Sequence, residues 1–170
     1  MQVLLKFSLA KELKTNAMRI LDNHKVRYDI RTYECEDFVD GVHMATTLGI
    51  PPESTFKTLV AVGKSGGHYV FVLPVAEEVD LKAAARAVGE KAVELIPVKD
   101  LLALTGYIRG GCTAIGMKKA FPTVLHESAL RFDTIAISGG RVGTTLFLSP
   151  ADFLRVTRAK TAAIIFEKAE

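Results

Sequence analysis

The sequence predicts a single α/β domain in which helices surround a central, curled, mixed and largely antiparallel sheet. Three observations support this class. The 170 residues suffice for one buried core without disulfide or metal staples. Segments rich in β-branched and aromatic residues occur between segments with helical apolar spacing. These segments do not follow a strict βαβ order, which favours a mixed sheet.

Bulk composition excludes several classes of protein. The chain is 49% hydrophobic and 24% charged, as in a compact fold rather than a disordered one. Its 22 basic and 19 acidic residues leave a net charge of +3, too small for a protein that binds nucleic acid mainly by charge. The longest apolar run, residues 69–76, is far shorter than the roughly 20 residues of a membrane helix.

Two cysteines, Cys35 and Cys112, occur without a CxxC or Cys/His cluster. We therefore expect no disulfide framework, metal site or cofactor, and a reducing cytoplasmic location. Residues 1–13 are interpreted as an N-terminal extension or lead-in to the first helix, and residues 14–170 as the domain.

The elements follow in order along the chain. A helix begins at Thr15 or Asn16 and carries apolar residues at 17, 20 and 21 on one face. Alternating apolar positions 26, 28 and 30 predict a half-buried strand that ends near Tyr33. Helical spacing at 42, 45 and 48 stops at Gly49.

A β-hairpin is predicted next. Residues 55–62 and 68–75 are strand-like, and the glycine-rich residues 63–67 between them suit a turn. Two helices follow, one capped by Asp80 and ended by Gly89, the other spanning about 98–104.

The C-terminal third begins with a loop. Residues 106–119, GYIRGGCTAIGMKK, have four glycines and neither apolar period, which predicts a shaped loop. Residues 132–154 then predict a strand, a glycine turn, a strand and a helix that starts at Ser149-Pro150. A last strand is expected over 161–166.

Lys57 lies at the start of the apolar strand FKTLVAV. One interpretation is a side chain that extends its ammonium into water, and the other is a donor at a pocket rim that holds a phosphate, carbonyl or sugar hydroxyl. Cys112 is a candidate nucleophile, but none of the four histidines stands in a recognisable relation to it, so a small buried hydrophobe is the alternative.

The glycines offer a second kind of candidate. Gly110, Gly111 and Gly116 allow the backbone to approach a phosphate or sugar, although their spacing matches no phosphate-binding motif. The turn Ser138-Gly139-Gly140-Arg141 presents an arginine that suits a phosphate or carboxylate. An ordinary loop, and a hairpin turn with an exposed arginine, are the alternatives. The standard hydrolase motifs are absent from the sequence.

Four segments together resemble the YbaK/EbsC family of aminoacyl-tRNA deacylases, which are relatives of the prolyl-tRNA synthetase editing domain. These segments are KTNAMRIL at 14–21, FKTLVAV at 56–62, GYIRGGCTAIGMKK at 106–119 and SGGRVG at 138–143. The resemblance implies a mixed α/β fold with a pocket for the aminoacylated 3′ end of tRNA. It also implies removal of cysteine from tRNA(Pro) that prolyl-tRNA synthetase has mischarged.

The resemblance assigns the family's pocket lysine to Lys57, its pocket tyrosine to Tyr33 and its glycine pair to Gly110-Gly111. Thr113 retains the hydroxyl where many members have Ser-Pro, and with Gly116 and the 138–141 turn it is expected to bind substrate. The implied chemistry is substrate-assisted: the cysteine thiol attacks its own ester carbonyl and releases a thiolactone, without a protein nucleophile.

Two alternatives remain open. One is a deacylase of the same family for another small amino acid, such as alanine, in which water attacks. The other is a non-catalytic module that binds tRNA or a synthetase. In every case the expected partners are the 3′ end of an aminoacylated tRNA and prolyl-tRNA synthetase. The sequence does not predict an oligomeric state.

Overall fold

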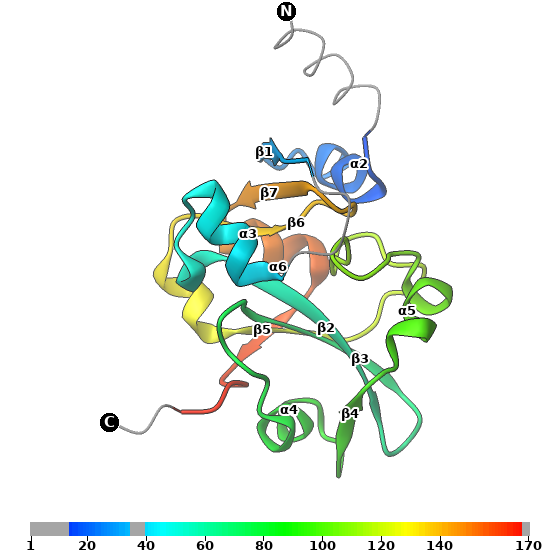
Figure 1. Cartoon of the computed structure of the whole chain (residues 1–170). Helices are drawn as coiled ribbons and strands as arrows, with labels where there is room; N and C mark the ends of the chain where they lie inside the picture. The colour runs from blue at the N-terminus through cyan, green and yellow to red at the C-terminus, as the bar shows by residue number, and fades with distance from the viewer. Residues whose placement is uncertain (1–13, 35–39, 168–170) are drawn as a thin grey trace, which may run out of the picture.

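A computed structural model describes residues 14–34 and 40–167 of the chain (Figure 1). The described α-helices are α2 (Asn16–Asn23), α3 (Gly41–Leu48), α4 (Leu81–Val88), α5 (Val98–Thr105) and α6 (Pro150–Thr157). The strands are β1 (Asp29–Thr32), β2 (Phe56–Gly63), β3 (His68–Pro74), β4 (Val93–Leu95), β5 (Thr123–His126), β6 (Ile135–Ser138), β7 (Thr144–Leu148) and β8 (Lys160–Ala162). The predicted α/β class is confirmed. The expected extension 1–13 and Cys35 lie outside the described residues.

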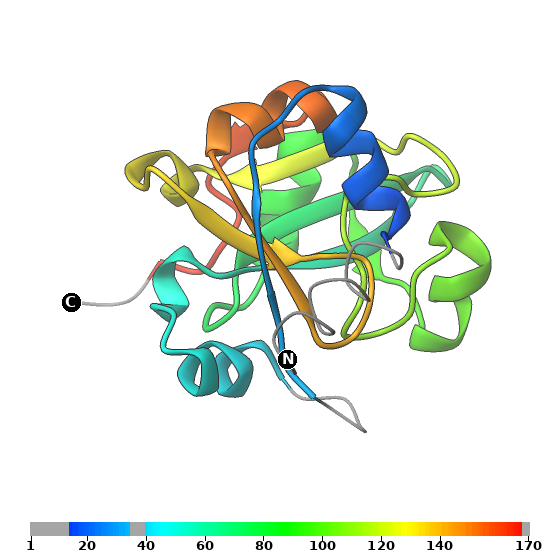
Figure 2. The ribbon, with the colours of Figure 1, turned by 90° about the horizontal axis from the view of Figure 1, so that it is seen from above.

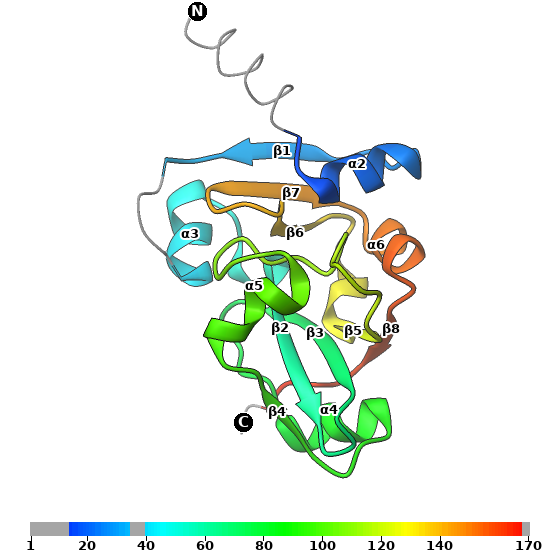
Figure 3. The same ribbon diagram turned by 90° about the vertical axis from the view of Figure 1, so that its right-hand side faces the viewer.

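The strands form two sheets rather than one. An antiparallel sheet has the order β1-β7-β6, and a mixed sheet has the order β4-β2-β3-β5-β8, in which only the β3–β5 and β5–β8 pairs are parallel. A single bridge between Thr55 and Ala136 links them. Seen from above, the three-stranded sheet crosses over β2 (Figure 2). α3 and α6 lie at opposite ends of this layer (Figure 3).

The predicted helices form where their caps satisfy free backbone N–H groups. The Thr15 hydroxyl accepts from the N–H of Met18, and the Asp40 carboxylate accepts from that of His43. Asp80 and Ser149 cap α4 and α6 in the same way. α3 and α4 end at glycines with positive φ, as predicted.

Three strand predictions need correction. β1 is exposed along its whole length rather than half-buried; it is an edge strand of the small sheet and pairs only with β7 among the described strands. The last strand ends at Ala162, and beyond it only Ile165 forms an isolated bridge, with Val79. β4 and β5 were not predicted at all. β5 is nevertheless a fully buried strand inside the larger sheet.

Both faces of the five-stranded sheet are covered. Val70 and Val72 of β3 belong to the main core, which also includes α2 and α6 residues. Phe71 and Leu73, on the opposite face, belong to a second core with α4. This period of two follows from the alternation of side chains along a strand. The rigid β2–β3 pair therefore anchors whatever β2 presents at its end. No helix in the described part of the chain has the length and apolarity to cross a bilayer.

Candidate active site

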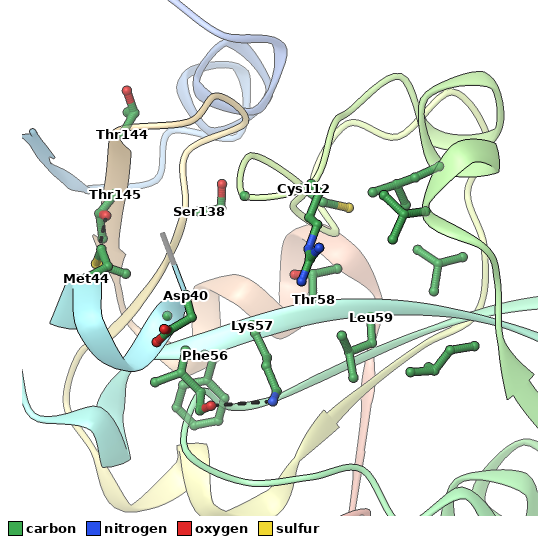
Figure 4. Close-up of a pocket in the computed structure, with 18 of the residues that line it drawn as sticks. Asp40, Met44, Phe56, Lys57, Thr58, Leu59, Cys112, Ser138, Thr144 and Thr145 are labelled. Carbon is green, nitrogen blue, oxygen red and sulfur yellow. Dashed lines mark hydrogen bonds between the residues drawn. The ribbon is translucent and has the colours of Figure 1, made fainter. Parts of the chain in front are cut away.

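A pocket of about 540 Å³ opens beside the start of β2 (Figure 4). Its walls come from β2, the end of β4, α5, the loop after α5, the start of α3 and the β6–β7 hairpin. This volume lies within the usual range for small-molecule sites. The lining residues are Tyr33, Asp40, Gly41, Met44, Phe56, Lys57, Thr58, Leu59, Val60, Val75, Leu95, Ile96, Val98, Leu101, Arg109, Gly110, Cys112, Ser138, Thr144 and Thr145.

Lys57 lines this pocket, and in Figure 4 its side chain extends from β2 between those of Phe56 and Leu59. It is half-buried, and its Nζ donates a long hydrogen bond of 3.4 Å to the carbonyl of Val75. Burial lowers the pKa of Lys57, while the nearby Glu78 and Glu77 carboxylates raise it. The β2–β3 register pairs Lys57 with Leu73, so rigid backbone holds this amine in place.

Asp40 supplies a carboxylate to the same pocket. One of its oxygens accepts from the N–H of His43, 2.9 Å away, which fixes the side chain as the cap of α3. The next residue must be small, because a Cβ on Gly41 would lie 2.5 Å from Cγ1 of Val75. Gly41 therefore allows the start of α3 to approach the β3 end of the pocket.

The β6–β7 hairpin supplies hydroxyl groups. Ser138, Thr144 and Thr145 line the pocket from this hairpin. Tyr33 reaches the pocket from the end of β1, where its N–H donates to the carbonyl of Gly143 at 2.8 Å. Gly143 has φ +85° and a Cβ there would lie 2.5 Å from the Tyr33 carbonyl oxygen, so this contact requires glycine.

The predicted shaped loop closes another side of the pocket. Gly110, with φ +85°, lines it, whereas the adjacent Gly111 faces away. A Cβ on Gly111 would lie 2.9 Å from the backbone nitrogen of Val142 and 3.0 Å from the Cα of Arg141. Gly111 thus permits close contact between the loop and the β6–β7 turn, two segments that the sequence analysis treated as separate candidates.

Five other predicted site residues are not among those that line the pocket: Thr113, Gly116, Gly139, Gly140 and Arg141. Each has a contact that shapes the surrounding loops. Thr113 is fully buried and its hydroxyl accepts from the N–H of Ile115. The carbonyls of Gly116 and Gly139 accept from Asn16 and Thr15 of the α2 start. The Gly140 N–H donates to Ser138, and Arg141 Nε donates to the Thr144 hydroxyl.

Cys112 lies at the pocket wall but is only 8% exposed. Burial raises the pKa of its thiol to about 12, and a hydrogen bond with Thr105 opposes that shift only weakly. No histidine lines the pocket among the described residues. The thiol therefore lacks the means of activation that a nucleophilic cysteine needs, which favours the interpretation of Cys112 as a buried hydrophobe.

Several pocket residues escaped the sequence analysis. Asp40 is the N-cap of α3 and Met44 belongs to that helix, for which the apolar spacing and the Gly49 end were predicted but no N-cap. Leu95 belongs to the missed strand β4. Of these missed pocket residues, Arg109 could most easily have been predicted from sequence, because it directly precedes the pair Gly110-Gly111. In the described part of the chain, no cluster of three or more His, Cys, Asp or Glu side chains is arranged to hold a metal ion.

The pocket thus combines an ammonium, a guanidinium, a carboxylate, several hydroxyls and a glycine loop, without a Ser-His-Asp or Cys-His arrangement in the described residues. Such a set of groups can orient a polar ligand and stabilise charge on it. It offers no activated side-chain nucleophile.

Comparison with known proteins adds independent information. Residues 36–156 match the aminoacyl-tRNA editing domain family. The chain is 47% identical over 154 residues to the "Putative Cys-tRNA(Pro)/Cys-tRNA(Cys) deacylase EbsC" of Enterococcus faecalis, a match that covers 89% of this chain and 93% of the relative.

Two solved structures are similar in fold. One is that of hypothetical protein APE2540, with a TM-score of 0.80 and 20% identity over 89% of this chain and all of that one. The other is "a putative trans-editing enzyme for prolyl tRNA synthetase", with a TM-score of 0.77 and 23% identity over 91% of this chain and 99% of that one.

Proposed function

Because the chain belongs to the aminoacyl-tRNA editing domain family, we propose that it is a deacylase that removes cysteine from mischarged Cys-tRNA(Pro). The observation that carries the proposal is Lys57, a half-buried amine that β2 holds in the lining of a pocket with no activated nucleophile among its described residues. The name of the Enterococcus faecalis relative supports the choice of cysteine and of tRNA(Pro).

The proposed reaction uses the substrate's own thiol. The sulfur of the esterified cysteine attacks its carbonyl carbon, the ester C–O bond breaks, and the thiol proton passes to the departing 3′ oxygen of the ribose. The products are a cysteine thiolactone and free tRNA. An intramolecular attack needs chiefly a near-attack conformation, which is worth roughly 7–11 kcal/mol in favourable cases. The enzyme then has to hold the ester in this conformation and to exclude conformations in which the thiol cannot reach the carbonyl carbon.

Lys57 and the hydroxyl groups have distinct parts in this scheme. The Lys57 ammonium holds the terminal phosphate or the 2′-hydroxyl. The phosphate, as a negative partner, would offset the burial that lowers the pKa of Lys57. The loop at Gly110 and the hydroxyl of Ser138 face the ester and favour the developing oxyanion. The Asp40 carboxylate accepts hydrogen bonds from the α-ammonium group of the amino acid.

The test is a deacylation panel on Cys-tRNA(Pro), Ala-tRNA(Pro) and Ser-tRNA(Pro). We expect rapid loss of cysteine and at most slow loss of alanine, because an alanine ester cannot cyclise. Similar rates on the cysteine and alanine esters would show attack by water instead. Binding of all three without release of amino acid would show a binding module and contradict the proposal.

A variant of Cys112 tests the same scheme from the protein's side. Cys112→Ala should retain the rate on Cys-tRNA(Pro) within about threefold, because its protonated, buried thiol takes no part in the chemistry. A folded but inactive Cys112→Ala protein, with folding checked by circular dichroism, would require a protein nucleophile and overturn the substrate-assisted scheme.

A further inference from the structure

One end of the pocket is apolar. Beyond Lys57 and Thr58, on the side away from Asp40, Figure 4 shows aliphatic side chains, and the lining there includes residues of β2, β4 and α5. We call the following set the apolar shelf: Leu59, Leu95, Ile96, Val98 and Leu101. It contains no charged or hydroxyl side chain, in contrast to the opposite end with Asp40, Ser138 and the two threonines.

The backbone of the shelf is well fixed. β4 pairs with β2 through Leu95 and Ala61, and the N–H of Ile96 donates to the carbonyl of Val60 at 3.0 Å. Pro97 follows at once and α5 begins at Val98. Leu101, one turn later, packs against the main core. The shelf therefore keeps its shape without a ligand, as a preorganised site should.

Part of the shelf is nevertheless open to solvent. Leu95 is 43% exposed and Val98 is 59% exposed, although both line the pocket. Large aliphatic groups left exposed beside a polar pocket indicate a surface that a ligand covers. Because the shelf is continuous with the pocket, that ligand must reach past Lys57.

We propose that the apolar shelf binds the adenine base at the 3′ end of tRNA, an inference that rests on the proposed function. In an aminoacyl-tRNA the amino acid and the base are attached to the same ribose, at opposite sides of it. With the ribose and phosphate at Lys57, the amino acid lies toward Asp40 and the base lies on the shelf. A flat, largely apolar base face packs well against aliphatic side chains, and no carboxylate in the shelf repels the adjoining phosphates.

This arrangement also assigns a direction to the substrate. The α-ammonium of the amino acid meets a carboxylate at one end, and the base meets apolar surface at the other. A reversed substrate would place the ammonium against the shelf without a partner, which is unfavourable for a charged group. The shelf thus orients the ester as well as binding it.

A binding experiment tests the shelf without any turnover. Methyl groups of Leu, Ile and Val are followed by NMR while adenosine 5′-monophosphate or ribose 5-phosphate is added to the full chain. We expect the mononucleotide to shift Leu95, Ile96 and Val98 signals, and the base-free sugar phosphate to leave them unchanged. Equal shifts with both compounds, or none at the shelf, would overturn the proposal. Shelf shifts in a protein that deacylates no aminoacyl-tRNA would instead refute the proposed function alone.

Kinetics with matched variants supply the second test. Val98→Ser should raise KM for Cys-tRNA(Pro) about tenfold with little change in kcat, because the lost apolar contact with the base is made equally in the ground and transition states. Leu102→Ser is the control, since Leu102 is 53% exposed on the same helix but does not line the pocket. Its KM should stay at the wild-type value. An equal rise for both variants would indicate that a larger partner covers α5, and would overturn the assignment to the base.

Discussion

Lys57 shows how a residue can be poorly suited to stability and well suited to a site. Its ammonium is half-buried, and the hydrogen bond that it donates to the carbonyl of Val75 is long at 3.4 Å. A buried charge with weak compensation costs free energy of folding. The lowered pKa of Lys57 has the same origin, since burial disfavours the charged form. An anionic ligand group would add a direct partner to the electrostatic effect of Glu77 and Glu78.

Replacing Lys57 with methionine should separate these two roles. Lys57→Met keeps the length of the side chain and removes the charge, so we expect the free energy of unfolding in urea to stay the same or to rise by up to about 1 kcal/mol. Activity on Cys-tRNA(Pro) should fall about 100-fold or more, because a charged donor is lost. Lys64→Met, in the exposed hairpin turn, is the control for a charge change alone. A parallel loss of stability and activity would mean that Lys57 is structural.

At the scale of elements, the contact between the 106–119 loop and the β6–β7 turn shapes the pocket. Gly111→Ala should cost about 2 kcal/mol of stability and much of the activity, because the new Cβ would meet the backbone of Arg141 and Val142, which cannot move independently. Gly67→Ala, where the nearest atom is the Tyr69 hydroxyl at 3.2 Å, at the far end of a side chain rather than in backbone, should cost less than about 0.5 kcal/mol. Urea unfolding and deacylation rates check both. Equal costs would contradict this close contact.

The helices and the hairpin were predictable from sequence because their signals are local. Caps such as Asp80 and stops such as Gly89 lie within a few residues of the helix they bound. β5 lacked such a signal. It has four residues, is buried on every side and pairs in parallel with β3 and β8, which are distant in sequence. Its existence depends on tertiary contacts that no short window contains.

Part of the candidate site, like part of the fold, was predictable from sequence. Lys57, Tyr33, Gly110 and Ser138 do line one pocket, although they come from four separate segments. The apolar shelf was not predicted. Leu95 lies in β4, a strand that the sequence did not predict, and Val98 lies in α5, whose sequence is that of an ordinary amphipathic helix. An exposed aliphatic residue becomes informative only when the structure places it beside a pocket.

The β5–β8 pair carries a pH-sensitive contact. His126, at the end of β5, is buried, and its Nδ1 accepts from the N–H of Ile164, which requires that nitrogen to be unprotonated. Burial is the main cause that lowers the pKa of His126 below its ordinary 6.5, while Glu127 opposes it. Protons therefore bind the unfolded chain more readily, and this group's contribution to stability is full above pH 6.5 and is lost as pH falls below that value.

We expect urea midpoints to drop between pH 7.5 and pH 5 for this reason. His126→Asn offers an amide oxygen as a non-titrating acceptor, so its midpoint should fall less over the same range. The difference between the two proteins isolates the histidine from the carboxylates, which the variant retains. Parallel pH profiles would show that His126 does not titrate in this range.

For the whole molecule, the distribution of charge limits how tRNA is bound. A net charge of +3 leaves little long-range attraction for a polyanion, and the proposed contacts concentrate on the last nucleotide at Lys57 and the shelf. Each phosphate that a protein neutralises adds about 0.7 to 0.9 to the negative slope of log affinity against log salt. Few such contacts imply weak binding of tRNA by this protein alone. We propose that prolyl-tRNA synthetase, which handles the same tRNA, supplies the remaining affinity.

The salt dependence of deacylation measures this directly. With Cys-tRNA(Pro) below KM, the slope of log kcat/KM against log salt should be no steeper than about −3, as for three or four phosphate contacts. Added prolyl-tRNA synthetase should raise kcat/KM and steepen the slope, because the complex then engages more of the tRNA. The synthetase added in this assay should be a catalytically inactive variant that still binds tRNA, because it cannot aminoacylate the released tRNA again. A slope near −10 for the protein alone would place an extended tRNA-binding surface on this chain and remove the need for the partner.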